Sequence, residues 1–224
     1  MKPCILIGVT FCAVAVADDS NIDIADKFAW AENVGWTNWR DAGDAAQGVV
    51  IGPNVLSGFI WAENIGHVNV GDGAPDDGAD PARYDNMDGS DFGVNVDPDG
   101  TLHGFAWAEN VGWINFDGGA LADPAQPARI GCTGRLHGYA WGENIGWINL
   151  DDETRFVAMD DSAVPQDCDV NDDGDIDGVD VQLFVDLLIS GGGGDWRQTC
   201  AGDLDADGGI DLDDVAAFVA CLLE

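Results

Sequence analysis

Basic residues are scarce in this sequence of 224 residues. Eight lysines and arginines stand against 42 aspartates and glutamates, which gives a formal net charge of −34 at pH 7. Such a surface repels phosphate backbones and anionic lipids, so nucleic acids and anionic membranes are poor partners. Long apolar runs are also missing beyond the N-terminus, which argues against a transmembrane helix there. A nucleophile elbow, a zinc signature and a phosphate-cradling loop are absent as well.

The N-terminus has the pattern of a secretory leader. Lys2 supplies a short positive region, residues 4–16 are mostly apolar, and small residues at 15–17 form a cleavage site before Asp18. The apolar stretch is too short to span a membrane as a helix. We therefore predict that residues 1–17 are a signal peptide and that the protein is secreted, to the extracellular medium or the cell surface.

Two acidic segments near the C-terminus share one spacing. Residues 169–180 and 203–214 each have oxygen-bearing side chains at positions 1, 3, 5, 9 and 12 and a glycine at position 6. Calcium needs about six to eight oxygen ligands, and the glycine permits the sharp turn that gathers them, as in an EF-hand loop. Position 7 contributes its backbone carbonyl. We predict two calcium ions, held by Asp169, Asn171, Asp173, Asp175, Asp177 and Asp180 in the first loop and by Asp203, Asp205, Asp207, Gly209, Asp211 and Asp214 in the second.

An apolar segment with helical spacing follows each loop. The apolar positions are Val181, Phe184, Val185 and Leu188 after the first loop, and Val215, Phe218, Val219 and Leu222 after the second. Before the loops, Pro165 and the four glycines at 191–194 argue against entering helices. Each unit is therefore expected to be a loop followed by one helix.

A duplicated calcium loop with an exit helix, at the C-terminus of a chain with a leader, resembles a dockerin domain. The resemblance covers about residues 163–224. It implies a small calcium-dependent docking module whose usual partner is a cohesin domain on a scaffold or cell-surface protein. In dockerins, positions 10 and 11 of each loop carry much of the recognition, often as Ser or Thr. The matching residues depart from that pattern and leave open the class of cohesin, and whether the partner is a cohesin; they are Gly178, Val179, Leu212 and Asp213.

Charge and cysteine content bear on the stability of this module. Residues 160–224 contain 18 acidic residues and one basic residue, Arg197, hence a net charge of −17. Carboxylates held close together repel without a metal, so calcium binding should be coupled to folding. Beyond the leader, four cysteines favour two disulfides with three connectivities, and they are Cys132, Cys168, Cys200 and Cys221. A pseudo-two-fold pair of loop–helix units brings Cys168 and Cys221 together, which favours that bridge.

Residues 18–160 contain an internal repeat. Four units of the form aromatic-x-Trp-x-Glu-Asn-x-Gly begin at Phe28, Phe59, Phe105 and Tyr139. Alternation of period two before the Glu-Asn-x-Gly turn predicts a β-hairpin in each unit, with the glycine in the left-handed conformation. Upstream segments add a third strand to units two to four, and residues 154–159 could do so for the first unit.

The expected fold is therefore mainly β. Four three-stranded units would close into a propeller-like or barrel-like ring, with an open repetitive sheet as the alternative, and a small α dockerin-like EF-hand pair would follow. The repeat module itself is assigned to no family. The expected organisation is a leader at 1–17, the β module at 18–160 and the docking module at 163–224.

Eight of the nine tryptophans lie in the repeat module. Large aromatics at fixed positions usually form the core of a small β module, so we expect the first Trp of each unit to be buried. The second is a candidate for stacking on sugar rings; these residues are Trp36, Trp113 and Trp147, with His67 in the second unit. The glutamates of the four turns suggest the paired carboxylates of glycoside hydrolases, but a catalytic acid needs one special environment and four equivalent copies indicate structure.

Together these patterns predict a secreted, calcium-binding and non-catalytic protein. The β module would present a surface for a glycan or another extracellular partner, and the C-terminal module would dock it onto a cohesin-like or other scaffold protein. Two alternatives stay open: an extracellular glycoside hydrolase that carries a dockerin, and a structural repeat protein of the cell surface. Release of sugar products would favour the first alternative, and self-assembly without a ligand would favour the second.

Overall fold

The computed structural model describes residues 20–43, 47–76, 78–79, 81–192 and 194–223, so the predicted signal peptide lies outside the described residues. The strands are β1 (Ile22–Ala31), β2 (Gly35–Asn38), β3 (Val50–Ile51), β4 (Leu56–Ala62), β5 (Gly66–Asp72), β6 (Val94–Val96), β7 (Leu102–Ala108), β8 (Gly112–Asn115), β9 (Arg129–Ile130), β10 (Leu136–His137), β11 (Tyr139–Gly142), β12 (Gly146–Asn149) and β13 (Val157–Met159). The helices are η2 (Gly118–Leu121), η3 (Asp161–Ala163), α1 (Gly178–Ser190), α2 (Trp196–Gly202) and α3 (Val215–Cys221). Among the described residues, none of the helices combines the length and apolar character that a membrane crossing requires.

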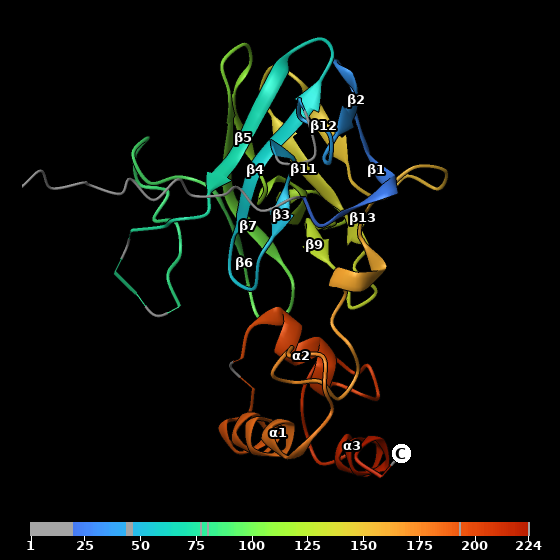
Figure 1. The fold of residues 1–224 in the computed structure, drawn as a ribbon. Helices are drawn as coiled ribbons and strands as arrows, with labels where there is room; N and C mark the ends of the chain where they lie inside the picture. The colour runs from blue at the N-terminus through green and yellow to red at the C-terminus, as the bar shows by residue number, and fades with distance from the viewer. Residues whose placement is uncertain (1–19, 44–46, 77, 80, 193, 224) are drawn as a thin grey trace, which may run out of the picture.

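Eight strands form a closed antiparallel barrel in the order β1-β2-β4-β5-β7-β8-β11-β12, and β12 pairs back with β1 (Figure 1). Each repeat unit contributes one hairpin, from unit one (β1–β2) to unit four (β11–β12). Neighbouring hairpins meet in one register, which places Asn38 opposite Trp61, Asn69 opposite Trp107, Asn115 opposite Trp141 and Asn149 opposite Trp30. The expected ring is thus a barrel. The propeller and the open sheet are wrong, because the hairpins hydrogen-bond to one another all the way round.

Short strands extend the barrel toward the helical part. Strand β3 pairs with β4 and β6 pairs with β7, as expected for the third strands of units two and three. In unit four the expected strand, β9, pairs with β10 just before the hairpin. Strand β13 pairs with β1, with Met159 opposite Ile22. The C-terminal segment of the β module therefore serves the first unit, as predicted.

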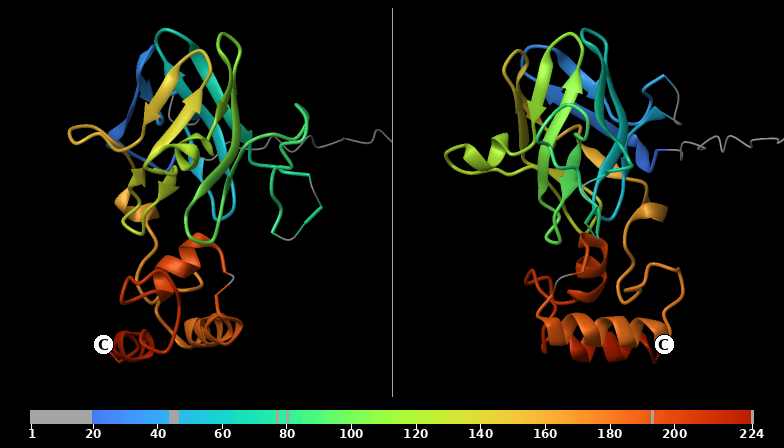
Figure 2. Two further views of the ribbon diagram at one scale, coloured as in Figure 1. Left: turned by 180° about the vertical axis from the view of Figure 1, so that it is seen from behind. Right: turned by 90° about the vertical axis from the view of Figure 1, so that its left-hand side faces the viewer.

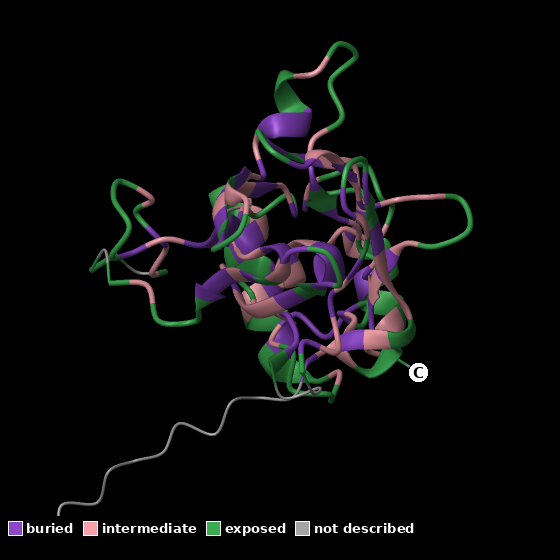
Figure 3. Ribbon diagram, turned by 90° about the horizontal axis from the view of Figure 1, so that it is seen from above, coloured by how far each residue is buried: buried purple, intermediate pink, exposed green. Residues whose placement is uncertain are grey.

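Small and β-branched side chains line the barrel interior. In β7, Ala106 and Ala108 are fully buried, whereas Trp107 between them is 37 % exposed. The same alternation recurs in the other hairpins, so the expectation that the first Trp of each unit forms the core is wrong. An eight-stranded barrel has a bore just wide enough for side chains, and alanines leave room for the Ile and Val side chains of the partner strands. The interior retains a cavity of only about 10 Å³, and buried residues gather at the centre when the molecule is seen from above (Figure 3).

Substitutions at two adjacent positions of β7 test which face of the strand lies inside the barrel. Ala106→Leu is expected to lower the free energy of unfolding by about 1–3 kcal/mol, because the interior has no space for added carbon atoms. The matched control, Trp107→Phe on the outer wall, is expected to change it by less than about 1 kcal/mol. Urea unfolding curves give both values. Similar effects of the two substitutions would contradict the assignment of the faces.

Each Glu-Asn-x-Gly turn connects the two strands of one hairpin, at the barrel end far from the helices. Their glycines have φ between +74° and +85°, the left-handed conformation predicted. The asparagine amide donates to a backbone carbonyl of the preceding unit in three turns, at 2.9 Å, from Asn64 to Val34, from Asn110 to Ile65 and from Asn144 to Val111. At the closure, Glu32 Oε2 accepts a hydrogen bond from the Trp147 backbone N–H at 3.1 Å. The Asn and Glu side chains of the turns thus hold adjacent units together.

The helical part is attached to the barrel through α2. Trp196 is fully buried within the barrel's own core cluster, and its Nε1 donates to the carbonyl of Gly52 at 3.0 Å. Cys200, one turn further along α2, forms a disulfide with Cys132 in the turn between β9 and β10. The views in Figure 2 show α2 against the barrel, with α1 and α3 beyond it. The two predicted modules therefore share core contacts and a covalent link.

Candidate metal centre and docking face

The carboxylate at position 1 organises the bend of each acidic loop. Asp169 accepts hydrogen bonds from the backbone amides at positions 5 and 6, at 3.1 and 2.8 Å. Asp203 accepts the same two bonds in the second loop, at 3.1 and 2.9 Å. Position 4 has positive φ in both loops, at Asp172 and Ala206, and so does the glycine at position 6. The glycine at position 6 is therefore needed for the turn, as predicted.

The carboxylate at position 12 ties the two ends of each loop together. Asp180 is fully buried and accepts hydrogen bonds from the amides at positions 3 and 9, at 3.1 and 2.8 Å. Asp214, 1 % exposed, accepts the equivalent bonds at 3.1 and 2.8 Å. Although Asp is one methylene shorter than the Glu usual at this position, both side chains reach the loop interior. The two loops thus share the hydrogen bonds that positions 1 and 12 accept from amides 3, 5, 6 and 9.

The second loop concentrates negative charge at one point. Carboxylate oxygens of Asp203, Asp205 and Asp214 all lie within 4.8 Å of one another. Desolvation, followed by the charge of Asp207 and then those of Asp214 and Asp203, raises the pKa of Asp205. Carboxylate and carbonyl oxygens are the ligands that calcium prefers, and a dication relieves their mutual repulsion. The residues present therefore fit a calcium ion.

The remaining predicted ligands lie around this framework. The side chain of Asn171 stands at position 3 of the first loop and donates to Asp173 at 2.9 Å. At position 9, Asp177 caps α1 by accepting from the Val179 amide, and Asp211 accepts from the amide two residues on. Position 9 often binds calcium through a water molecule, so capping is compatible with a ligand role. Positions 5 and 7 carry Asp173 and Asp175 in the first loop and Asp207 and Gly209 in the second.

Both predicted exit helices are present, as α1 and α3, but the expectation that neither loop has an entering helix is wrong for the second. Helix α2 runs directly into that loop. The side chain of its N-cap, Asp195, accepts hydrogen bonds from the backbone amides of Arg197 and Gln198, and the side-chain oxygen of Gln198 accepts one from the Asp195 amide in return. The glycine run instead ends α1, with Gly191 in the left-handed conformation as C-cap. The spacing Asp195-x-x-Gln198 is a capping-box signal that would have located α2.

The two exit helices lie side by side in a small core of their own. Phe184 of α1 stacks on Phe218 of α3, with ring centroids 4.0 Å apart. The Cys168–Cys221 disulfide joins the start of the first loop to the end of α3, as predicted. Arg197, the basic residue of this module, makes two hydrogen bonds to Asp172 in the first loop, at 2.8 and 2.9 Å. These contacts tie the loops to the helices.

Helices α1 and α3 and the residues beside them also carry exposed apolar side chains, and we call this set the docking face. Its members are Val179, Val181, Val185 and Ile189 on α1, and Leu212, Val219 and Leu223 at or beside α3. The predicted stripes are therefore divided, because Phe184 and Phe218 face the core while Val181, Val185 and Val219 are exposed. Of the residues expected to contact a partner, Val179 and Leu212 belong to the docking face, at 57 % and 77 % exposure. Gly178 and Asp213 are also exposed beside them.

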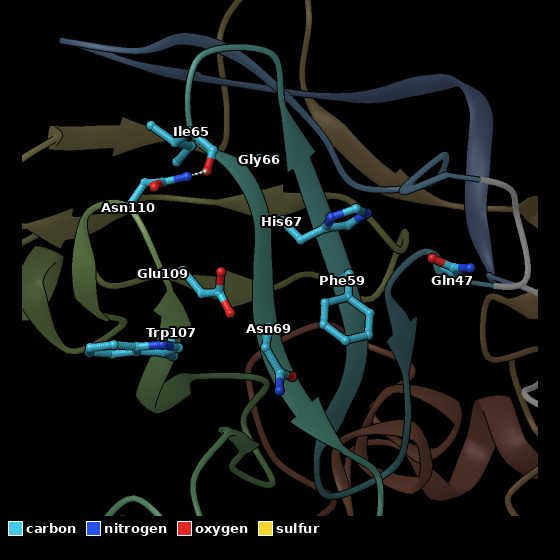
Figure 4. Close-up of a pocket in the computed structure, with 9 residues that line it drawn as sticks. All are labelled: Gln47, Phe59, Ile65, Gly66, His67, Asn69, Trp107, Glu109 and Asn110. Carbon is cyan, nitrogen blue, oxygen red and sulfur yellow. Dashed lines mark hydrogen bonds between the residues drawn. The ribbon is translucent and has the colours of Figure 1, made fainter.

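The outer wall of the barrel carries one aromatic pair per unit. In units two to four the rings in contact are Phe59 with His67, Phe105 with Trp113, and Tyr139 with Trp147, and in unit one Arg155 lies over both Phe28 and Trp36. Next to the pairs of units two and four stand the first Trp and the Glu of the neighbouring hairpin. In unit two this arrangement leaves a groove of about 490 Å³, where Glu109 lies between Trp107 and Phe59 (Figure 4). The second-position tryptophans thus lie on the wall, where the sequence placed them.

The connection that leads to each unit supplies neighbours to its aromatic pair. Arg155 lies over the unit-one pair, and Phe92 packs on Trp113 of unit three with centroids 5.1 Å apart. In unit four the pair lines an open groove of about 560 Å³. Of the three predicted stacking residues, Trp147 lines this groove, and Trp113 lines a smaller one of about 350 Å³.

The chain matches no protein-family model, no curated protein and no solved structure. Functional inference therefore rests on the residues described above.

Proposed function

We propose that this is a secreted calcium-binding protein whose C-terminal loop–helix pair docks the β barrel onto a protein partner. The observation that supports it is the identical hydrogen bonding of two acidic loops, in which position 1 binds amides 5 and 6 and position 12 binds amides 3 and 9. Each loop would hold one calcium ion with the ligands named above. The ions would supply the positive charge that keeps the carboxylates together and so fix α1 and α3.

In this proposal the partner contacts the docking face. Contiguous exposed apolar side chains usually mark a binding surface, since water contact with them is unfavourable. Helices α1 and α3 lie beyond α2, so a partner bound there would leave the barrel wall free. The resemblance to a dockerin supports the same assignment and a cohesin-like or other scaffold protein as the partner. The two disulfides and the predicted leader support an oxidising, extracellular location.

The two alternatives differ in what they require of the barrel. For a glycoside hydrolase, one turn glutamate would have to act as the acid, yet Glu32 binds a backbone amide at the barrel closure and its three counterparts occupy equivalent turns. Sugar release that a single Glu or Asp substitution abolishes would identify an enzyme. Self-assembly without any ligand would identify a structural surface protein. The proposal remains a non-catalytic one.

Charges placed on the docking face are expected to abolish partner capture. Val185→Asp combined with Ile189→Asp should weaken binding at least about 100-fold, because two apolar anchors become charged at the centre of the interface. Calcium uptake should stay unchanged, since neither residue is a ligand. The measurement is a pull-down from the secretome of the source organism with and without EGTA, followed by titration of the recovered partner.

The matched control is Ile24→Asp, which charges an equally exposed apolar residue on β1 and should leave capture unchanged. A partner that the doubly charged variant retains, or that binds equally well in EGTA, would refute the assigned surface.

A further inference from the structure

The aromatic pair of unit one holds a cation supplied by the chain itself. The guanidinium of Arg155 lies 5.4 Å from the ring centroid of Phe28 and 6.0 Å from that of Trp36. Cations within about 6 Å of an aromatic face are attracted to its π electrons. Arg155 comes from the connection between β12 and β13, which leads from unit four back to unit one. The molecule thus contains one example of a wall groove with an occupant.

The equivalent groove of unit four is open and acidic. Its floor is the pair Tyr139 and Trp147, and Trp30 and Glu32 of unit one form its other wall. The corresponding connection, from β8 to β9, places Asp123 at this groove where unit one has an arginine. Among the described residues that line the groove, none is basic, and two are carboxylates.

We propose that the groove of unit four binds the guanidinium of an arginine side chain from a basic partner protein. A guanidinium stacks on aromatic faces and pairs with carboxylates, which matches the two kinds of side chain in the groove. The volume of about 560 Å³ lies in the range of ligand pockets. The net charge of −34 attracts basic partners over long distances and disfavours acidic polysaccharides. This surface is separate from the docking face and does not depend on calcium.

The other units explain why unit four is the site. Unit one is occupied by Arg155, and in unit three Phe92 packs edge-on against the Trp113 ring. Unit two is open, but His67 replaces the second Trp there, and Gln47 of its connection lines the groove. Unit three has a smaller groove, of about 350 Å³, in which Asp88 is the carboxylate that lines it beside Phe105 and Trp113. The groove of unit four is larger and is lined by two carboxylates, Glu32 and Asp123.

The test uses the full-length, disulfide-bonded protein with calcium and with ¹⁵N-labelled tryptophan. A Gly-Arg-Gly peptide is expected to shift the indole N–H resonances of Trp147 and Trp30. The same peptide with citrulline, which keeps the shape of arginine but is neutral, should bind at least about tenfold more weakly. Raising the salt concentration should weaken binding of the arginine peptide, because the rim carboxylates become screened.

Substitutions test whether the peptide binds in the groove of unit four. Trp147→Ala and Glu32→Gln are each expected to weaken the peptide at least about fivefold, and glutamine keeps the acceptor for the backbone amide of residue 147. Trp113→Ala, the same change in unit three, should leave the affinity unchanged, since Trp113 is not among the residues that line this groove. Arg155→Gln should uncover unit one and create a second site that the Trp36 resonance reports. Far-UV circular dichroism verifies the fold of each variant.

Three results would overturn the proposal. Equal binding of the arginine and citrulline peptides would remove the role of charge. Failure of Arg155→Gln to create a second site would break the equivalence of units one and four. Shifts of Trp147 with cellohexaose but not with the arginine peptide would identify the groove as a sugar-stacking surface instead.

Discussion

Replacing Asp169 and Asp203 together with alanine is expected to abolish calcium binding and to unfold α1 and α3 while the barrel stays folded. Each of these carboxylates accepts two backbone hydrogen bonds at the bend of its loop and stands at position 1 of the ligand set. At free calcium a thousandfold above Kd, each site contributes about 4 kcal/mol to stability, and the variant loses both contributions. The remaining carboxylates then repel one another without compensation.

Isothermal titration measures the calcium uptake and far-UV circular dichroism measures the helical signal. Asp213→Asn is the matched control, since it removes one exposed charge at position 11 without touching a ligand. It should preserve both readouts. Calcium uptake that persists in the double variant would disprove the ligand assignment, and so would a wild-type protein whose helices keep their signal in excess EGTA.

Trp196→Ala is expected to lower the free energy of unfolding by about 3–5 kcal/mol, the cost of deleting a large buried aromatic side chain. The indole is fully buried in the barrel core and donates a hydrogen bond to the carbonyl of Gly52. Removal of the indole leaves that carbonyl without its donor, which adds to the cost. Because this side chain joins α2 to the barrel, the variant should also lose the effect of calcium on the melting temperature of the barrel.

Urea and thermal unfolding with and without calcium measure both effects. Trp61→Phe provides the comparison, because Trp61 lies on the outer wall at 37 % exposure and should cost less than about 1 kcal/mol. A Trp196→Ala variant as stable as the Trp61→Phe variant would contradict the shared core.

Local patterns predicted the elements that depend on local physics. The loop spacing, the left-handed turn glycines and the helices after the loops follow from residue types at short separations. The pairing of residues 157–159 with β1 is instead inferred from the repeat, because the first unit lacks a preceding strand. Period-two alternation also located the hairpins. The alternation does not show which face of a strand is buried, because the pattern is the same whether Ala106 or Trp107 faces the interior. The narrow bore, a property of eight strands together, determines that alanine lies inside.

The attachment of the helical part was missed because it depends on contacts across the chain. Trp196 is separated by 144 residues from the carbonyl that its indole binds. Two signals were present in the sequence, the Asp195-x-x-Gln198 cap and a ninth tryptophan that belongs to no repeat. Likewise, the fold is a barrel rather than a propeller because each hairpin hydrogen-bonds to the next one. The turn asparagines contribute to this contact, but the sequence does not show which carbonyls accept their hydrogen bonds.

The uniform register between hairpins has an evolutionary consequence. Because each unit meets the next through the same backbone pairing, the lengths of the intervening connections can change without altering closure, as the spacings of 31, 46 and 34 residues between unit starts illustrate. Insertions therefore fall on the periphery, where each one diversifies the chemistry above a single aromatic pair. Selection can thus explore four neighbouring surfaces almost independently, while one shared framework preserves the shape that displays them.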